Sequence, residues 1–128
     1  MRLRFLPLVI LLLVPSVVFA VADGAWLRRV PDEDRARKNP VAGQAAAIRV
    51  GEGLFHENCA RCHGVDADGR TTRPSLRSAR IRGASDGSLL WMLRNGNPYK
   101  GMPPAQALSE PQKWQVIAYL RSLPPSKK

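Results

Sequence analysis

Three segments of the chain place hydrophobic residues at the three- and four-residue spacing of a helix. The first covers residues 44–58. The second follows Ser85, a residue type that favours helix N-termini, and stops at Gly96. The third follows Ser109, which starts a capping-box pattern, and stops at Pro124. Since no segment alternates polar and apolar residues as a strand does, the sequence predicts one all-α domain.

Residues 1–22 have the composition of an export signal. Arg2 and Arg4 precede an uncharged run, residues 5–22, that ends in the small residues Ala-Val-Ala. This pattern is typical of a signal peptide that is cleaved. An uncleaved membrane anchor is the alternative, because 18 uncharged residues reach the lower limit for crossing a bilayer.

The next segment, residues 23–43, carries many charges and two prolines and has neither helical nor alternating periodicity. It is predicted to form an extended polar arm. Trp26 and Leu27 are its large apolar residues, and we expect them to pack onto the domain. The helical domain then covers residues 44–124, and residues 125–128 form a basic tail.

The chain of 128 residues is strongly basic, with a formal net charge of +10. Cleavage after residue 22 removes two arginines and no acid, which leaves +8 on 106 residues. Such a charge attracts anionic membranes or acidic protein surfaces. Aromatic residues do not interleave with the basic ones as stacking on bases requires, so no nucleic-acid partner is predicted.

Both cysteines and one of the two histidines lie in one short stretch, NCARCHGVDADG, residues 58–69. A thioredoxin-type dithiol needs a βαβ setting, which is not found here. A closed zinc site has only Cys59, Cys62, His63 and His56 to draw on, and these lie too close along the chain for a tetrahedron. A disulfide accounts for the cysteines in an oxidising compartment but leaves His63 unexplained.

Haem attachment accounts for all three residues. Thiols three apart on a turn lie on one side of the backbone, where each can add to a porphyrin vinyl group, and His63 then lies under the iron. Met102, with 38 residues between it and His63, is the candidate for the opposite ligand, because Gly101 and Pro103 hold it in a stiff loop. The alternative is a methionine packed in a turn, and the upstream motif favours the ligand.

From about residue 44 to residue 123, the chain resembles a class I monohaem cytochrome c. The matching segments are GEGLFHENCARCHG, the proline of RPSL, GMPP and IAYLRSL. The resemblance implies a small cytochrome c fold, with three main helices around one covalently attached haem c. It implies that Cys59 and Cys62 attach the haem and that His63 and Met102 are the axial iron ligands.

The resemblance also assigns roles to residues around the haem. It implies that the carbonyl of Pro74 accepts a hydrogen bond from Nδ1 of His63, which fixes the tautomer of the ring. It implies that Gly51 and Phe55 on the first helix meet Tyr119 on the last. The polar arm is a departure from the minimal family pattern, and the resemblance implies no role for it.

Other residues are expected to have structural roles. His56 is expected to be an exposed helical residue, and Trp91 and Tyr99 are expected to be pocket walls. The acid-free run of residues 69–85 is expected to be a solvated loop. Its arginines have a second interpretation, as partners of the haem propionates or as a ring that steers an acidic partner: Arg70, Arg73, Arg77, Arg80 and Arg82.

An iron with both axial positions filled has no site for substrate, and the chain lacks a Ser/His/Asp set and a phosphate loop. It is therefore predicted not to be an enzyme. The resemblance implies an exported electron carrier in the periplasm or on the outer face of the cytoplasmic membrane. Its partners are redox proteins with acidic docking surfaces, and it contacts the membrane only if the N-terminal segment is retained.

Two alternatives stay open. One is an exported thiol-disulfide oxidoreductase that uses Cys59 and Cys62. The other is a haem protein in which a small ligand displaces Met102 from the iron.

Overall fold

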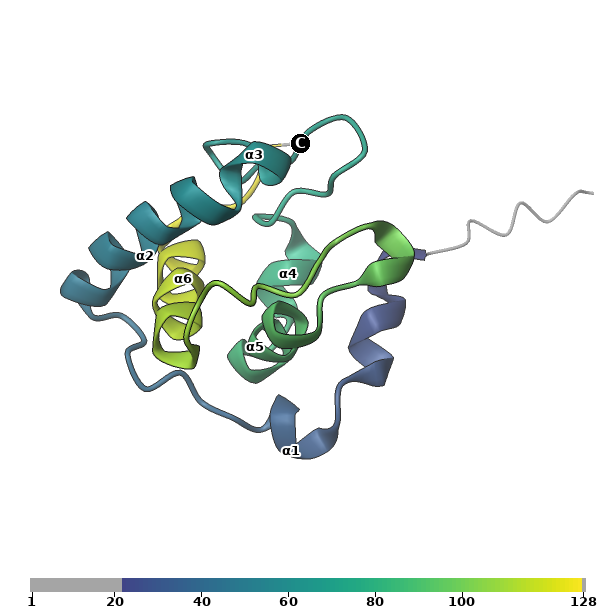
Figure 1. Ribbon diagram of the computed structural model, residues 1–128, viewed down its shortest axis with the longest axis horizontal. Coiled ribbons are helices and arrows are strands. Elements are labelled where there is room, and N and C mark those ends of the chain that lie inside the picture. The colour runs from purple at the N-terminus through teal and green to yellow at the C-terminus, as the bar shows by residue number, and fades with distance from the viewer. Residues whose placement is uncertain (1–21, 128) are drawn as a thin grey trace, which may run out of the picture.

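The computed structural model describes residues 22–127, and every regular element in this range is a helix (Figure 1). The predicted all-α fold is confirmed. In chain order the elements are η1 (Ala22–Arg29), α1 (Asp32–Arg35), α2 (Ala45–Asn58), α3 (Ala60–His63), α4 (Ala79–Gly83), α5 (Asp86–Asn95), η2 (Pro98–Lys100) and α6 (Glu110–Ser122).

The predicted export signal, apart from Ala22, lies outside the described residues. Between residues 22 and 127, no helix has both the length and the apolar character that crossing a bilayer requires.

The three helices predicted from periodicity are α2, α5 and α6. Ser85 is the N-cap of α5, and its side chain accepts a hydrogen bond from the backbone N–H of Ser88 at 3.1 Å. Ser109 is the N-cap of α6 and forms both hydrogen bonds of a capping box with Gln112. These caps satisfy backbone N–H groups that have no partner inside a helix, so local sequence is enough to define both starts.

Helices α2 and α6 pack directly against each other and form one half of the core (Figure 1). Phe55 of α2 is fully buried, and its ring lies 5.5 Å from that of Tyr119, as the resemblance implies. Gly51 lies where the two helices approach closely, with the backbone of Gln115 and Val116 nearest to it. Residues four apart share one helix face, so Gly51 meets α6 one turn before the Phe55 contact.

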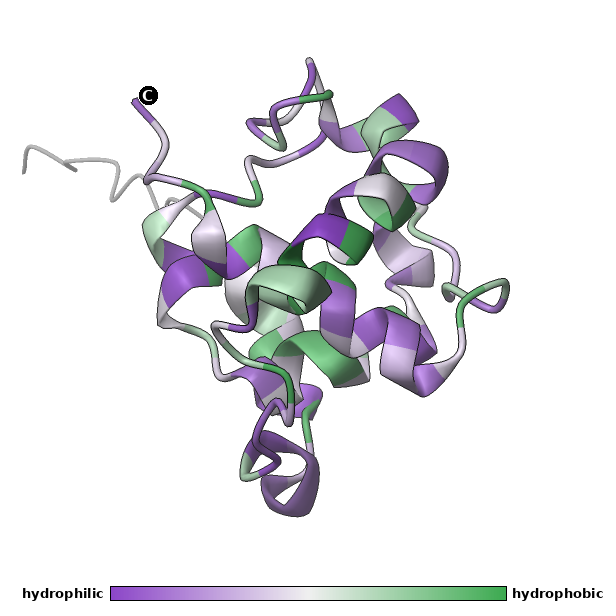
Figure 2. Ribbon diagram, turned by 90° about the vertical axis from the view of Figure 1, so that its left-hand side faces the viewer, coloured by the Kyte–Doolittle hydropathy of each residue, from purple (hydrophilic) through white to green (hydrophobic). Residues whose placement is uncertain are grey.

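The other half of the core joins α5 and α6 to the arm. Leu90 and Trp114 are buried together with Trp26 and Val30 of the arm. Trp26 retains 6% of its accessible surface, and Leu27 is partly buried, which confirms that both pack onto the domain. In Figure 2 the hydrophobic segments lie on the helices in the middle of the molecule, and the hydrophilic α1 lies at its lower edge.

Several short helices lie in segments predicted to lack them. The arm, predicted to be extended, contains η1 and α1, and the two predicted loops contain α4 and η2. Helices this short are unstable in isolation. Their sequences also show no periodic pattern from which they could be predicted. Tertiary contacts stabilise them instead: Trp26 is buried on η1, and Arg121 of α6 donates hydrogen bonds to carbonyls of residues 81, 82 and 84.

Candidate functional site

A single cavity of about 480 Å³ is lined by all five residues that the sequence analysis selected for the site. These are Cys59, Cys62, His63, Pro74 and Met102. The volume lies in the range of roughly 300–1,000 Å³ that is usual for cofactor sites. Much of the remaining wall is apolar and comes from η1, α2, α5 and α6: Trp26, Phe55, Leu89, Leu93, Val116 and Ile117.

The motif lies in a single helical turn that continues from α2. The backbone N–H of Cys59 donates to the carbonyl of Phe55 at 2.8 Å, so the last turn of α2 leads directly into the motif. The N–H groups of Cys62 and His63 both donate to the Cys59 carbonyl, at 3.1 and 3.0 Å. This turn brings the two thiols and the imidazole to one cavity from a five-residue segment.

Both thiols are free, with Cys59 partly buried and Cys62 exposed, and Cys59 lacks the character of a redox-active cysteine. Burial, with a smaller contribution from the charge of Cys62, raises the pKa of Cys59 to about 11. Reactive cysteines have a lowered pKa, because the thiolate is the nucleophile. The raised pKa of Cys59 therefore does not favour thiol-disulfide exchange at this residue.

His63 has a lowered pKa and a buried nitrogen without a partner. Burial is the largest cause of the lowering, the charge of Arg73 adds to it, and the carbonyl of Pro74 opposes it. Nδ1 is buried, yet no hydrogen bond of normal geometry joins it to any group of the described chain. The Pro74 carbonyl raises the pKa of His63 as a backbone hydrogen-bond acceptor does, although the contact falls short of full hydrogen-bond geometry. A neutral imidazole is the form that binds a metal ion.

Met102 is held in a tight loop on the cavity wall. Asn97 and Met102 exchange two backbone hydrogen bonds, of 2.8 and 3.1 Å, across η2. The N–H of Ala105 donates to the Leu93 carbonyl at 2.8 Å and ties the loop to α5. The thioether is therefore carried by backbone that is fixed on both sides, as a ligand requires.

One residue of the site was not identified from the sequence, and two expectations were wrong. Trp26 provides the aromatic wall from the arm, and Arg73 lines the cavity and donates to the Lys100 carbonyl at 2.7 Å. Tyr99, expected to be a wall, is 87% exposed, and Trp91 does not line the cavity either. Tyr99 lies in the loop at η2, whose geometry no periodic pattern encodes, and Trp91 of α5 packs against the core cluster instead.

The arginine run is only partly a solvated loop. Arg77 donates to the carbonyls of Pro124 and Pro125 at 2.7 and 3.1 Å, and Arg82 donates to that of Leu123 at 2.9 Å. These arginines hold residues 123–125 against the domain. His56 is exposed, as expected.

The zinc interpretation has no support in the described part of the chain. Between residues 22 and 127, no group of three or more His, Cys, Asp or Glu side chains gathers in a way that would hold a metal ion. The donor set at the cavity is instead two thiols, one neutral imidazole and one thioether, which suits a covalently attached haem with His and Met ligands.

Comparison with known proteins gives a consistent result. Residues 46–120 match the family model described as cytochrome c oxidase, cbb3-type, subunit III. Cytochrome c550 of Pseudomonas aeruginosa is 30% identical over 90 residues, which are 67% of this chain and 62% of that protein.

Two solved structures have the same fold. Cytochrome cL from Methylophaga aminisulfidivorans is 27% identical with a TM-score of 0.61, over 68% of this chain and 59% of that one. Cytochrome cL from Hyphomicrobium denitrificans is 23% identical with a TM-score of 0.59, over 78% and 67%, and supports the fold alone. The chain spans less than two thirds of the length of cytochrome c550 and of the first cytochrome cL.

Proposed function

The chain belongs to the c-type cytochrome family, and from this premise we propose that it is an exported carrier of single electrons with a His63/Met102-ligated haem. Family members hold a covalently attached haem c. One observation carries the proposal: Cys59, Cys62, His63 and Met102 line the same cavity, although Met102 is far from the others in the sequence.

Each residue has a separate task in this proposal. When bound, the haem supplies the Fe(III)/Fe(II) couple. Cys59 and Cys62 tether it through thioethers, and His63 and Met102 fill both axial positions, which leaves no site for a substrate. The Pro74 carbonyl is proposed to accept the hydrogen bond from Nδ1 of His63 and so to fix the ring. The apolar wall excludes water, which favours the less charged Fe(II) state.

The thiol-disulfide alternative is disfavoured by the state of Cys59. Its pKa of about 11 leaves almost no thiolate at neutral pH. The ligand-binding alternative requires Met102 to leave the iron, whereas the loop that carries Met102 is fixed by hydrogen bonds at Asn97 and Ala105.

Mass spectrometry of the exported protein is the most direct test. One mass reports whether a haem is attached and whether residues 1–22 are cleaved. We expect the mass of residues 23–128 plus one haem, and loss of the haem when both Cys59 and Cys62 are replaced by serine. A protein without haem, but with an oxidisable Cys59–Cys62 dithiol, would contradict the proposal.

The axial methionine is tested by spectroscopy of two variants. A thioether bound to ferric haem produces a long-wavelength charge-transfer band. Met102→Ala should abolish this band and allow the reduced protein to bind carbon monoxide, whereas Met92→Leu should keep the band. Loss of the band in Met92→Leu alone would identify Met92 as the ligand and refute the assignment of Met102.

The basic charge supports a partner with an acidic docking surface. A formal +8 on the mature chain attracts such a surface, and salt screens this attraction. Electron transfer to an acidic partner should therefore slow as ionic strength rises. Rates that do not change with salt would contradict electrostatic steering.

A further inference from the structure

The polar arm contacts the loop that carries Met102. Nη2 of Arg29 donates to Oδ1 of Asn97 at 3.2 Å, and the Arg29 guanidinium lies 5.4 Å from the centroid of the Tyr99 ring. Asn97 in turn exchanges both backbone hydrogen bonds with Met102. Arg29 of the arm therefore contacts the loop at Asn97, the residue whose backbone is paired with that of Met102.

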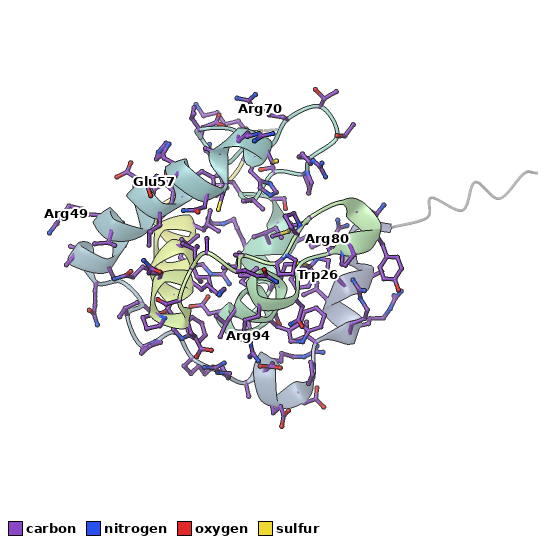
Figure 3. The ribbon with its side chains drawn as sticks, in the orientation of Figure 1. Trp26, Arg49, Glu57, Arg70, Arg80 and Arg94 are labelled. Carbon is purple, nitrogen blue, oxygen red and sulfur yellow. The ribbon has the colours of Figure 1, made fainter. Side chains whose placement is uncertain are left out.

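The same part of the arm also forms the cavity wall beside this loop. Trp26 extends from η1 toward the core of the domain (Figure 3) and is buried in the cluster against which Met102 packs. It lines the cavity together with Met102. In Figure 1 the loop after α5 runs beside η1. The arm and the loop therefore form one continuous piece of the wall.

The rest of the arm is firmly anchored, so it provides a rigid base for this contact. A Cβ added at Gly87 of α5 would lie 1.9 Å from the carbonyl oxygen of Asp34, which shows how closely α1 approaches α5. Four polar contacts fix the arm to α5 and α6: Asp34 with Arg94 at 3.0 Å, Arg37 with Glu110, Asn39 with the Trp114 carbonyl at 3.0 Å, and the Arg35 carbonyl with Ser85 at 2.8 Å.

The loop is held from its other side by the segment that follows the motif. Nη1 of Arg73 donates to the carbonyl of Lys100 at 2.7 Å. Arg29 and Arg73 thus hold the loop between the arm and the segment after His63. Of these two contacts with the loop, the one made by Arg29 comes from the polar arm.

We propose that the arm, residues 23–43, is a clamp for the Met102 loop and that Arg29 is a positioning residue for the axial thioether. This inference rests on the proposed role of Met102 as an iron ligand. An added ligand reaches the iron only in molecules whose loop has moved away, so its apparent affinity scales with the fraction of open loops. Weakening the clamp raises that fraction.

Imidazole binding to the ferric, haem-loaded mature protein measures this fraction. Arg29→Ala removes the hydrogen bond and the contact with Tyr99, and we expect it to raise the imidazole affinity about fivefold, equivalent to about 1 kcal/mol. Arg28→Ala is the matched control, because Arg28 is exposed, carries the same charge and has none of the contacts described for Arg29. Equal affinities in the two variants would overturn the clamp.

A double-mutant cycle tests the route through Asn97. If Arg29 acts on the loop through Asn97, the variant with both Arg29→Ala and Asn97→Ala should change imidazole affinity by less than the product of the single effects. Effects that multiply would overturn that route. Arg29→Lys keeps the charge and a donor, and should return the affinity toward that of the wild type.

Failure of the clamp and failure of the proposed function give different results. A wild-type protein that lacks the thioether charge-transfer band refutes Met102 as the ligand and removes the basis of the clamp. If the wild-type protein shows the band, but Arg29→Ala and Arg28→Ala have the same imidazole affinity, only the clamp is refuted. Thermal unfolding of both variants checks that neither substitution changes the fold.

Discussion

Replacing Gly51 by alanine tests the closest approach between α2 and α6. An ideal Cβ at this position lies 1.9 Å from the carbonyl oxygen of Gln115, and ordinary contacts begin near 3.4 Å. The two helices must therefore move apart by about 1.5 Å, or the backbone must bend. The obstacle is backbone, so no side-chain rotation relieves it.

Two opposing effects determine the size of the change. Alanine has a higher helix propensity than glycine, which stabilises an α-helix by about 1 kcal/mol. Overpacking a close-packed interior costs roughly 1–3 kcal/mol, and a backbone obstacle belongs at the upper end. We therefore expect Gly51→Ala to lower the free energy of unfolding by about 2 kcal/mol.

Gly53 of the same helix provides the matched control. It is exposed, and a Cβ there has no atom within 4 Å, so only the propensity term remains. Gly53→Ala should raise the free energy of unfolding by about 1 kcal/mol. Urea unfolding of the mature, haem-loaded protein measures both changes. A Gly51→Ala variant as stable as the wild type would refute the packing argument.

Three further substitutions test other contacts by urea unfolding. Asn39→Ala removes a buried hydrogen bond to the Trp114 carbonyl and one accepted from the N–H of Val41, and should cost about 1–3 kcal/mol, whereas the exposed Asn95→Ala should change stability by less than about 0.5 kcal/mol; equal costs would contradict the role of burial. Ser109→Ala removes the capping box and should cost about 1 kcal/mol, and no loss would mean that the cap does not stabilise α6. Arg37 lowers the pKa of Glu110, so its stabilising effect is present at neutral pH and is lost as the pH falls through that lowered value. The wild type should therefore exceed Glu110→Gln in stability at pH 7 and lose this advantage once the pH falls below the lowered pKa of Glu110; an advantage that persists after Glu110 is protonated would refute the ion pair as its source.

The main helices and the chemistry of the motif could be predicted from the sequence because both depend on residues close together in the chain. Ser85 and Ser109 each accept a hydrogen bond from a backbone N–H three residues later, so both helix starts are local properties. Cys59, Cys62 and His63 likewise lie within one helical turn. Their roles at the haem stay predictions, as do those of Pro74 and Met102.

The polar arm shows why other features could not be predicted. Its short helices have no periodic pattern, since they are stabilised by burial of Trp26 and Val30 against α5 and α6. Tyr99 was wrongly expected in the wall, because residue type reports how apolar a side chain is and not the direction in which a loop turns it.

The sequence by itself determined that this is an all-α chain with three main helices and one CxxCH motif, because helix periodicity, capping and ligand spacing act over a few residues. The tertiary structure alone decided which residues complete the cavity and where the arm packs. Arg29 and Asn97 are 68 residues apart, and Arg73 meets the Met102 loop from a different segment. Contacts over such separations form only when the helices have packed, so they follow from the shape of the whole core.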